Sequence, residues 1–258
     1  MKIVVPIKVA GSLDETAKLQ NGEIDSSSLE FDVNEWDRFA VEAALELRDN
    51  NEGEVVIISV GGDEVEDGLL TALAMGADRG IQVEVEDEAQ KLDAITLAKV
   101  IAKAIEDESP DLVLCGTQTS DGASAATGTA LAALMGLPRV AVVRSLDYSG
   151  GELTVRRELE GGLLEQVKLS TPALVTVQTG INEPRYATLR GIRQAASKPR
   201  DEKSLEDLGL DEQALVASSA SQVGLAAPPE SQGAQILEGD AAAIASQIAS
   251  IIKSKVGA

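Results

Sequence analysis

The feature that most constrains this chain is the regular alternation of short β-branched runs with segments of helix length. The apolar runs occupy residues 2–9, 54–60, 81–85, 111–115 and 140–146. Between them, residues 37–48 and 91–107 repeat apolar side chains at helical spacing, and residues 64–76 and 122–136 have helical compositions. Strands that alternate with helices form parallel sheets, because a parallel pair needs a long crossover. The sequence therefore predicts an α/β protein of three layers, in which helices cover both faces of a doubly wound, mainly parallel sheet.

The pattern changes after residue 146. A Ser-Gly-Gly turn at 149–151 leads into an alternating run at 152–158, and a second such run follows at 165–169. Alternating runs joined by short turns are typical of antiparallel hairpins. We therefore expect an antiparallel β-ribbon within residues 146–170. The apolar run at 173–179 predicts one further strand, which completes the regular part of the chain.

The C-terminal part of the chain, residues 196–258, is predicted to be an acidic linker followed by a helical arm. Residues 226–235 have the Pro, Gly and Ser content of a linker, and a last helix is expected at about 240–256 with Asp240 as its N-cap. Four isoleucines form one narrow apolar stripe on this helix: Ile244, Ile248, Ile251 and Ile252. The stripe is too thin for a separate domain. We expect it to dock either on a partner chain or on the body of its own chain.

The absence of histidine and the presence of one cysteine exclude several chemistries. Without imidazole there is no Ser-His-Asp or Cys-His catalytic set and no histidine metal ligand. Cys115 alone cannot form an internal disulfide, which suits a reducing compartment and predicts a cytoplasmic protein. No apolar run approaches the length of a membrane span, so we expect no membrane insertion.

Acidic residues dominate the charge. The chain has 43 Asp and Glu against 22 Lys and Arg, a formal net charge of −21 at pH 7. Nucleic acids are bound through Lys and Arg that neutralise phosphates, so a nucleic-acid partner is not expected. Carboxylates spread along a whole chain also characterise proteins that stay soluble at very high salt, where screening weakens self-repulsion. The composition therefore predicts a halophilic source.

Residues that follow the predicted strands are candidate ligand contacts, because ligands bind beyond the carboxyl ends of parallel strands. After the first two strands these are Pro6, Ile7, Lys8, Gly61 and Gly62. The segment GTQTSDGASAATG at 116–128 combines glycines, hydroxyls and a helix start. That combination suits a phosphate, and a capped strand-to-helix turn is an equally weighted alternative. Neither a Walker sequence nor G-x-G-x-x-G is present, so triphosphate hydrolysis and a standard Rossmann cofactor are not supported.

The residues before the first predicted helix have local explanations. Asn34 is predicted to cap that helix, with Asp37 three residues later in the reciprocal position. Trp36, in the first turn, is either a half-buried plug or a flat surface offered to a planar ring. The acidic residues at 63–67 are interpreted as a solvated helix start rather than a metal site.

Three segments resemble the β subunit of electron transfer flavoproteins. VRRELEGGLLEQVKLSTPALVT at 155–176 fits the family signature throughout, with its basic residue, its acid-Gly-Gly turn and its proline before an aliphatic strand. TALAMGADRGIQV at 71–83 and NEPRYATL at 182–189 resemble two further phrases of the family. Because the similarity runs in order from residue 2 to about 195, the sequence is identified as a member of this family.

The resemblance implies an adenine nucleotide α-hydrolase-like fold and an obligate αβ heterodimer. In this family the α subunit holds most of the FAD, and the β subunit adds a nucleotide site, part of the flavin's surroundings and a docking loop. The β site holds AMP in ordinary carriers and a second FAD in electron-bifurcating members. The implied organisation is a nucleotide-binding α/β domain at 1–195, with the docking loop at 180–190, followed by the linker and arm.

Carried over position by position, the implied nucleotide site consists of Pro6, Ile7, Asn34, Val60, Gly61, Gly116, Gln118, Thr119, Asp121, Gly122, Ser124 and Thr127. Strand-end backbone would bond the adenine edge, and loop hydroxyls with helix amides would hold the phosphate. Small residues at 122–126 replace the amide side chains that touch phosphate elsewhere in the family. Backbone amides, Ser124 and Thr127 must therefore do more of the binding, or the ligand differs.

Two further sets of residues match the family pattern. Trp36 stands at the position of the family's flavin-facing aromatic residue. The docking loop for partner dehydrogenases retains Glu183, Pro184, Arg185, Tyr186 and Leu189. Leu189 is the apolar residue that the family uses as an anchor, and a buried loop leucine is its alternative interpretation.

The resemblance implies electron carriage and no catalytic residue in this chain. The heterodimer would take electrons from acyl-CoA-type dehydrogenases at the α-bound FAD and pass them to an electron transfer flavoprotein–quinone oxidoreductase. A carrier tolerates the absence of histidine, because outer-sphere electron transfer needs no general base. One alternative is a bifurcating subunit that binds a second FAD and oxidises NADH, since the small residues at 122–126 leave room for a diphosphate. A more distant alternative is a nucleotide sensor of the universal-stress type.

Overall fold

The computed structural model describes residues 1–13, 19–20, 23–24, 29–85, 92–211, 224–226, 229 and 233–256. The chain divides into two compact units, Met1–Gly224 and Leu225–Ala258. The first unit contains a large sheet with helices on both faces. The second contains one described helix, so each unit is treated by itself.

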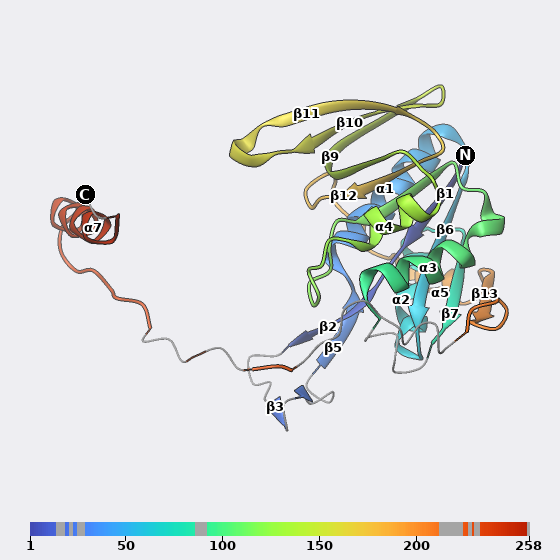
Figure 1. Cartoon of the computed structure of the whole chain (residues 1–258), viewed down its shortest axis with the longest axis horizontal. Helices are drawn as coiled ribbons and strands as arrows, with labels where there is room; N and C mark the ends of the chain where they lie inside the picture. Colours follow the sequence, from blue (N-terminus) through green and yellow to red (C-terminus); the bar gives the residue numbers. More distant parts are fainter. Residues whose placement is uncertain are drawn as a thin grey trace. The chain divides into compact units, whose positions relative to one another are not determined.

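A nine-stranded sheet forms the centre of the first unit (Figure 1), in the order β11-β10-β9-β12-β8-β1-β6-β7-β13. Its strands are β1 (Lys2–Pro6), β6 (Glu54–Gly61), β7 (Arg79–Glu84), β8 (Leu112–Gly116), β9 (Arg139–Ser149), β10 (Glu152–Glu158), β11 (Leu164–Ser170), β12 (Ala173–Val177) and β13 (Arg200–Ser204). Neighbours along β9-β12-β8-β1-β6-β7-β13 pair in parallel, whereas β9, β10 and β11 are antiparallel. The predicted mainly parallel sheet with an antiparallel ribbon is confirmed.

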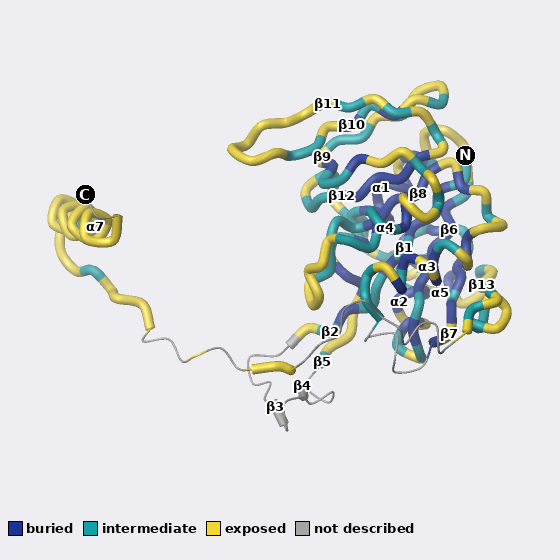
Figure 2. The backbone as a smooth tube through the Cα atoms, in the orientation of Figure 1, coloured by how far each residue is buried: buried dark blue, intermediate teal, exposed yellow. Residues whose placement is uncertain are grey.

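Helices cover both faces of this sheet. They are α1 (Glu35–Asn51), α2 (Glu64–Met75), α3 (Ala94–Ala104), α4 (Thr127–Leu134) and α5 (Leu189–Ala195), with 3-10 turns at Glu106–Glu108 and Glu160–Gly162. Leu45 of α1 and Leu69 of α2 are buried against one face, whereas Leu131 of α4 is buried with α3 against the other. Figure 2 shows the buried backbone concentrated in the sheet and the inner sides of these helices. The three predicted layers are therefore present.

Successive side chains of the central strands pack alternately against the two helix layers. In β1, Ile3 and Val5 pack with α1 and α2, while Val4 packs in the core formed with α3 and α4. All three side chains are fully buried. Because both faces of these strands are covered, the strands are continuous apolar runs rather than alternating ones.

The first strand is shorter than the apolar run at 2–9. Pro6 has no amide hydrogen to continue the ladder, and after it the chain leaves the large sheet. Two small antiparallel pairs follow: β2 (Val9–Leu13) with β5 (Leu29–Val33), and β3 (Leu19–Gln20) with β4 (Glu23–Ile24). Neither pair was predicted, although residues 29–33 of β5 alternate between apolar and acidic side chains.

Helix α4 begins later than the composition predicts. It starts at Thr127 instead of residue 122, because Ala123 and Ala125 have left-handed backbone angles, with φ of 47° and 50°. A right-handed helix excludes such residues, so the segment before Thr127 remains a loop. The small residues Ser124, Ala125 and Ala126, which line the cavity, therefore lie in a loop and not in the first turn of a helix.

Residues 196–211, which composition assigned to a linker, belong to the first unit. Residues 200–204 form β13, which pairs in parallel with β7 at the sheet edge, and Leu205, Leu208 and Leu210 pack against the core on the α3 side. An edge strand with exposed polar side chains has no apolar period, which explains why the pattern of this segment resembled a linker.

A topological switch point lies between β1 and β8. Strand β6 follows β1 in the chain and pairs on one side of it, while β8 pairs on the other side. In doubly wound sheets the connections on the two sides of such a point cover opposite faces, which opens a crevice at the carboxyl ends of the strands. The fold therefore directs attention to the residues just after β1 and β8.

The second unit contains α7 (Ala241–Val256). The Asp240 carboxylate accepts a hydrogen bond from the amide of Ala243 at 2.8 Å, as an N-cap does. None of the residues of α7 is buried, and Ile248, Ile251 and Ile252 are all exposed. The predicted apolar stripe is therefore present on the helix surface, with Ile244 partly buried, and Figure 2 shows α7 as mainly exposed.

Candidate functional site

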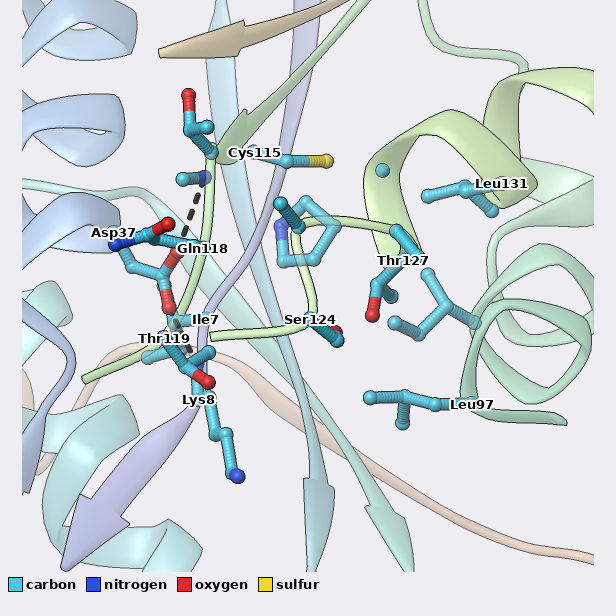
Figure 3. A pocket seen from close by; sticks show the side chains of 17 residues that line it. Ile7, Lys8, Asp37, Leu97, Cys115, Gln118, Thr119, Ser124, Thr127 and Leu131 are labelled. Atoms are coloured by element: carbon cyan, nitrogen blue, oxygen red, sulfur yellow. Dashed lines mark hydrogen bonds between the residues drawn. The ribbon is translucent and has the colours of Figure 1, made fainter. Parts of the chain in front are cut away.

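A cavity lies at the carboxyl ends of β1 and β8, at the switch point (Figure 3). It is lined by the end of β1 with the residues after it, by Asp37 of α1, by the end of β8 with residues of the loop 117–126, and by residues of α3 and α4. Leu97 and Leu131 supply apolar wall, while Thr119, Ser124 and Thr127 supply hydroxyls. A cavity with one apolar side and several polar groups on the other suits a small organic ligand with a polar end.

Asp37 of α1 joins the two strand ends at the cavity. Its Oδ2 accepts from the amide of Lys8 at 2.9 Å, and its Oδ1 accepts from the amide of Gly116 at 3.0 Å. The residue is 5% exposed. Burial raises the pKa of Asp37 to about 7, although the amides of Lys8 and Gly116, the Asn34 side chain and the Lys8 charge all lower it. Burial, together with the negative charge of Asp37, raises the pKa of the neighbouring Cys115 thiol.

Asn34 occupies the predicted N-cap position of α1, but the predicted capping hydrogen bonds of the Asn34 and Asp37 side chains are wrong, because the Asn34 side chain makes no such bond. Instead, its Nδ2 donates to the carbonyl of Gln118 at 2.9 Å and its Oδ1 accepts from the amide of Ser120 at 3.1 Å. The carboxylate of Asp37 faces the strand ends described above. Tertiary partners therefore replaced the local hydrogen bonds that the sequence predicted.

Lys8 is the cationic side chain in the lining of this cavity. Its Nζ lies 2.5 Å from Oδ2 of Asp121, in the loop that leads to α4. This ion pair and the Asn34 bonds hold the loop 117–126 against the start of α1. Lys8 and hydrogen bonding lower the pKa of Asp121, against the opposing effect of burial, which is the largest single cause.

The loop 117–126 presents small residues and free amides to the cavity. Ser124, Ala125 and Ala126 line it directly, and Thr127 and Gly128 begin α4 there. Gly128 is needed for close approach, because a Cβ at that position would lie 2.8 Å from Cγ2 of the buried Thr176. Backbone amides at the start of a helix, with hydroxyls beside them, form a donor set that matches a phosphate.

The structure brings together part of the predicted nucleotide site. Of the predicted residues, the cavity is lined by Pro6, Ile7, Gly116, Gln118, Thr119, Ser124 and Thr127. Asn34 and Asp121 are joined to its walls by the hydrogen bonds and the ion pair described above. Gly122 is an exposed loop residue, and Val60 and Gly61 end β6 without lining the cavity.

Lys8 was predicted as a candidate ligand contact after the first strand, and it lines the cavity, although it was not among the residues carried over to the nucleotide site. Asp37 was predicted only as a cap, and Cys115 was not assigned to the site. The available signal was their position, since each lies at a strand end or a helix start that the switch point brings together. The lining leucines of α3 and α4 carry no signal distinct from ordinary core residues.

Trp36 lies beside this site with a defined ring orientation. It is half-buried, and its Nε1 donates to Oε1 of Gln178 at 2.7 Å. Gln178 follows β12, and the same Oε1 also accepts from the amide of Thr179 at 3.1 Å. A ring held at one edge and open on part of its surface remains able to meet another planar group.

The predicted docking loop is anchored to α1 at its base and exposed at its tip. Arg185 donates from Nε and Nη2 to the carboxylate of Glu42 at 2.8 Å each, and its amide donates to Oε2 at 3.0 Å. Glu42 is 4% exposed. Tyr186 and Leu189, in contrast, are 93% and 79% exposed. Leu189 begins α5, so its alternative interpretation as a buried loop leucine is wrong.

Comparisons with known proteins agree with the fold and the motifs. The electron transfer flavoprotein domain family matches residues 22–208. The chain is 41% identical over 265 residues to the electron transfer flavoprotein subunit beta of Methylophilus methylotrophus, covering all of both chains. It is 32% identical to the protein of that name from Bacillus subtilis over 99% of this chain and 98% of the relative. The human protein of that name is 36% identical over 226 residues, 87% of this chain and 84% of the relative.

The fold first defines the class, a doubly wound α/β protein with a switch-point cavity. The similarity over the full length then shows the family: the chain belongs to the electron transfer flavoprotein β-subunit family. The family name describes one subunit of an electron-transferring flavoprotein. Among the described residues, no helix has the length and apolarity to cross a bilayer, and no group of His, Cys, Asp and Glu is arranged to hold a metal.

Proposed function

We propose that this chain pairs with an α subunit to form an electron carrier, and that it contributes a nucleotide site, a flavin-facing ring and a docking loop. The observation that carries the proposal is family membership over the whole chain, together with a switch-point cavity at the position that the family motif assigns to a nucleotide. The carrier would accept electrons from acyl-CoA-type dehydrogenases at an FAD held mainly by the α subunit. It would deliver them to an electron transfer flavoprotein–quinone oxidoreductase.

The donor set of the cavity supports AMP as the ligand. An adenine ring would lie between the strand ends and the apolar side chains Leu97 and Leu131, and the phosphate would face Ser124 and Thr127. Lys8 supplies the cation that a phosphate group favours. Its ammonium group, now paired with Asp121, would then interact with both Asp121 and the phosphate. The bound nucleotide would act as a folding ligand that stabilises the chain in proportion to its binding.

The flavin's surroundings would include Trp36. Its hydrogen bond to Gln178 fixes the plane of the indole before any partner binds, which lowers the entropy cost of meeting a flavin edge. The β chain then acts by position: it orients an aromatic surface and excludes water near a flavin whose redox chemistry is its own.

The exposed residues Tyr186 and Leu189 support the docking role of the loop. Tyr186 and Leu189 are exposed three residues apart in the predicted docking loop, and neighbouring exposed apolar and aromatic side chains are typical of interaction sites. The Arg185–Glu42 pair holds the base of the loop, so the tip is presented on a rigid support.

The nucleotide content of the purified heterodimer tests the proposal. Release by denaturation and mass spectrometry should find one FAD and one AMP per heterodimer. Two FAD with NADH oxidation would instead support the bifurcating alternative, which the small exposed residues at 122–126 favour because they leave room for a diphosphate. A stable homodimer that never associates with a flavin-bearing chain would refute both and favour a universal-stress-type nucleotide sensor.

A further inference from the structure

The ends of β1 and β8 part from each other at the cavity. Their recorded pairing stops at Val4 with Val113. Beyond it, β1 stays with β6 as far as Pro6 and Ile58, and β8 stays with β12 as far as Gly116 and Val177. Since Pro6 has no amide hydrogen, the ladder between β1 and β8 cannot continue through it. The two strands that border the cavity therefore lack backbone bonds to each other where the cavity opens.

The Asp37 carboxylate bridges this gap. One oxygen accepts from Lys8, just beyond β1, and the other accepts from Gly116, the last residue of β8. The dashed lines of Figure 3 run from Asp37 to both strand ends. One side chain thus replaces the missing ladder bonds and sets the separation between the two walls.

Gly116 shows how closely the carboxylate approaches. A Cβ at position 116 would lie 2.2 Å from Oδ1 of Asp37 and 2.8 Å from Cβ of Trp36. Since Gly116 has no positive φ, this close approach rather than backbone conformation explains the glycine. The contact between α1 and the end of β8 leaves no space for a side chain.

We propose that Asp37 is a positioning residue that joins the ends of β1 and β8 and thereby sets the width of the cavity for an adenine nucleotide. The inference rests on the nucleotide site of the proposed function. Asp37 acts through the backbone of Lys8 and Gly116, which line the cavity, and so its effect on a ligand is indirect. Accepting from two amides requires the carboxylate form, because a carboxamide or a carboxylic acid offers a donor at one of its two positions.

The charged and titratable groups around Asp37 come from three elements. Lys8, after β1, is the nearest cation, and it is itself paired with Asp121 of the loop. Cys115 of β8 is buried beside it, and its raised pKa keeps the thiol neutral near pH 7. Asn34 provides a hydrogen bond without charge. Protonation of the Asp37 carboxylate is therefore expected near neutral pH. It would weaken one of the two hydrogen bonds by which Asp37 joins Lys8 and Gly116.

The test compares Asp37→Asn with Glu35→Gln in the complete heterodimer. Glu35 is exposed in the same turn of α1, so the control removes the same charge without touching the strand ends. After removal of bound nucleotide, the Kd of AMP is measured between pH 6 and pH 8. At each pH the Kd of the variant is divided by the Kd of the wild type, so that the titration of AMP itself cancels. We expect Asp37→Asn to raise the Kd about tenfold at pH 8, the effect of about one lost hydrogen bond, and less than about threefold at pH 6.

Amide hydrogen exchange is the second measurement, and it needs no ligand. Asp37→Asn should speed exchange at the amides of Lys8 and Gly116, while Glu35→Gln should leave both amides protected. Unchanged protection in Asp37→Asn would overturn the bridge. Lost protection with an unchanged Kd, or with a ratio that does not vary with pH, would show a structural bridge only and would overturn the positioning role.

The two proposals fail in different ways. If the wild-type heterodimer binds neither AMP nor FAD at this cavity, the nucleotide function fails and the positioning role fails with it, while the exchange data still decide whether Asp37 joins the strands. If the wild type binds AMP and the Asp37→Asn ratio stays near one at every pH, the nucleotide function stands and the positioning role alone is refuted.

Discussion

Helix α1 carries two buried carboxylates, one at the candidate nucleotide cavity and the other at the predicted docking loop. Asp37, in its first turn, faces the concave cavity and is held by two backbone amides. Glu42, further along, supports the convex docking loop and is held by the guanidinium and the amide of Arg185. Both are nearly inaccessible, at 5% and 4% exposure.

The difference lies in how each negative charge is compensated. Amides compensate it with dipoles, so desolvation still dominates and raises the pKa of Asp37 to about 7. A bidentate guanidinium compensates it with a full opposite charge, and the same contact raises the pKa of Arg185. The cavity end of α1 is therefore expected to respond to pH, whereas the loop end is held by an ion pair.

Arg185→Leu should give the largest effect, because it leaves Glu42 buried without its cation. Breaking such a pair by removing one partner typically costs about 3 kcal/mol or more, and the partial exposure of Arg185 places the expectation at the lower end, about 2–3 kcal/mol. Urea denaturation of the heterodimer measures the loss. Arg190→Leu, an exposed arginine of α5, is the matched control and should change the free energy by less than about 0.5 kcal/mol. Equal losses in both variants would remove the distinction between the two carboxylates.

Leu189→Ala tests whether the loop that the Arg185–Glu42 pair supports is a docking site for partner dehydrogenases. Truncation of an interface anchor typically costs about 2 kcal/mol, so the KM of a partner dehydrogenase for the heterodimer should rise about thirtyfold, with flavin content and kcat unchanged. Ile95→Ala removes an exposed apolar side chain from α3 and serves as the control. Unchanged partner kinetics in Leu189→Ala would refute the docking role.

Per pH unit, the pH dependence of stability that Asp37 contributes is the smallest of these expected effects. Its pKa is raised in the folded chain from 3.8 to about 7, so between those values the folded state holds a proton that the unfolded state has released. This contribution is complete below the unfolded pKa and is lost as the pH rises through the folded one. Relative to Asp37→Asn, wild-type stability should fall by at most about 1.4 kcal/mol per pH unit from pH 5 to pH 7, then level off.

Urea denaturation of both heterodimers at pH 5, 6, 7 and 8 measures this difference. If the free energy of unfolding of the wild type and of Asp37→Asn varied with pH in parallel, Asp37 would have to stay ionised in the folded chain. The charged form that would join the strands is thus the form that burial disfavours, and folding stability and cavity geometry respond to pH in opposite directions.

Much of the fold could be predicted from local sequence. The apolar runs identified the central strands because both faces of each are buried, and the Ser-Gly-Gly turn identified the β9–β10 hairpin. Family motifs selected residues such as Ser124 and Thr127, which line the cavity. Helix α5 and strand β13 were missed, because one is short and the other lies at an exposed polar edge.

By itself, the sequence determined the layered α/β class, the family and the absence of histidine chemistry, since these depend on residue type and on periodicity along the chain. Only the tertiary structure decided the roles of Asn34 and Asp37. Their side chains can cap a helix or reach across space, and local spacing favours the cap. Folding brings the ends of β1 and β8, and the loop after β8, to the start of α1, where the amides of Lys8, Gly116 and Ser120 bind these side chains instead.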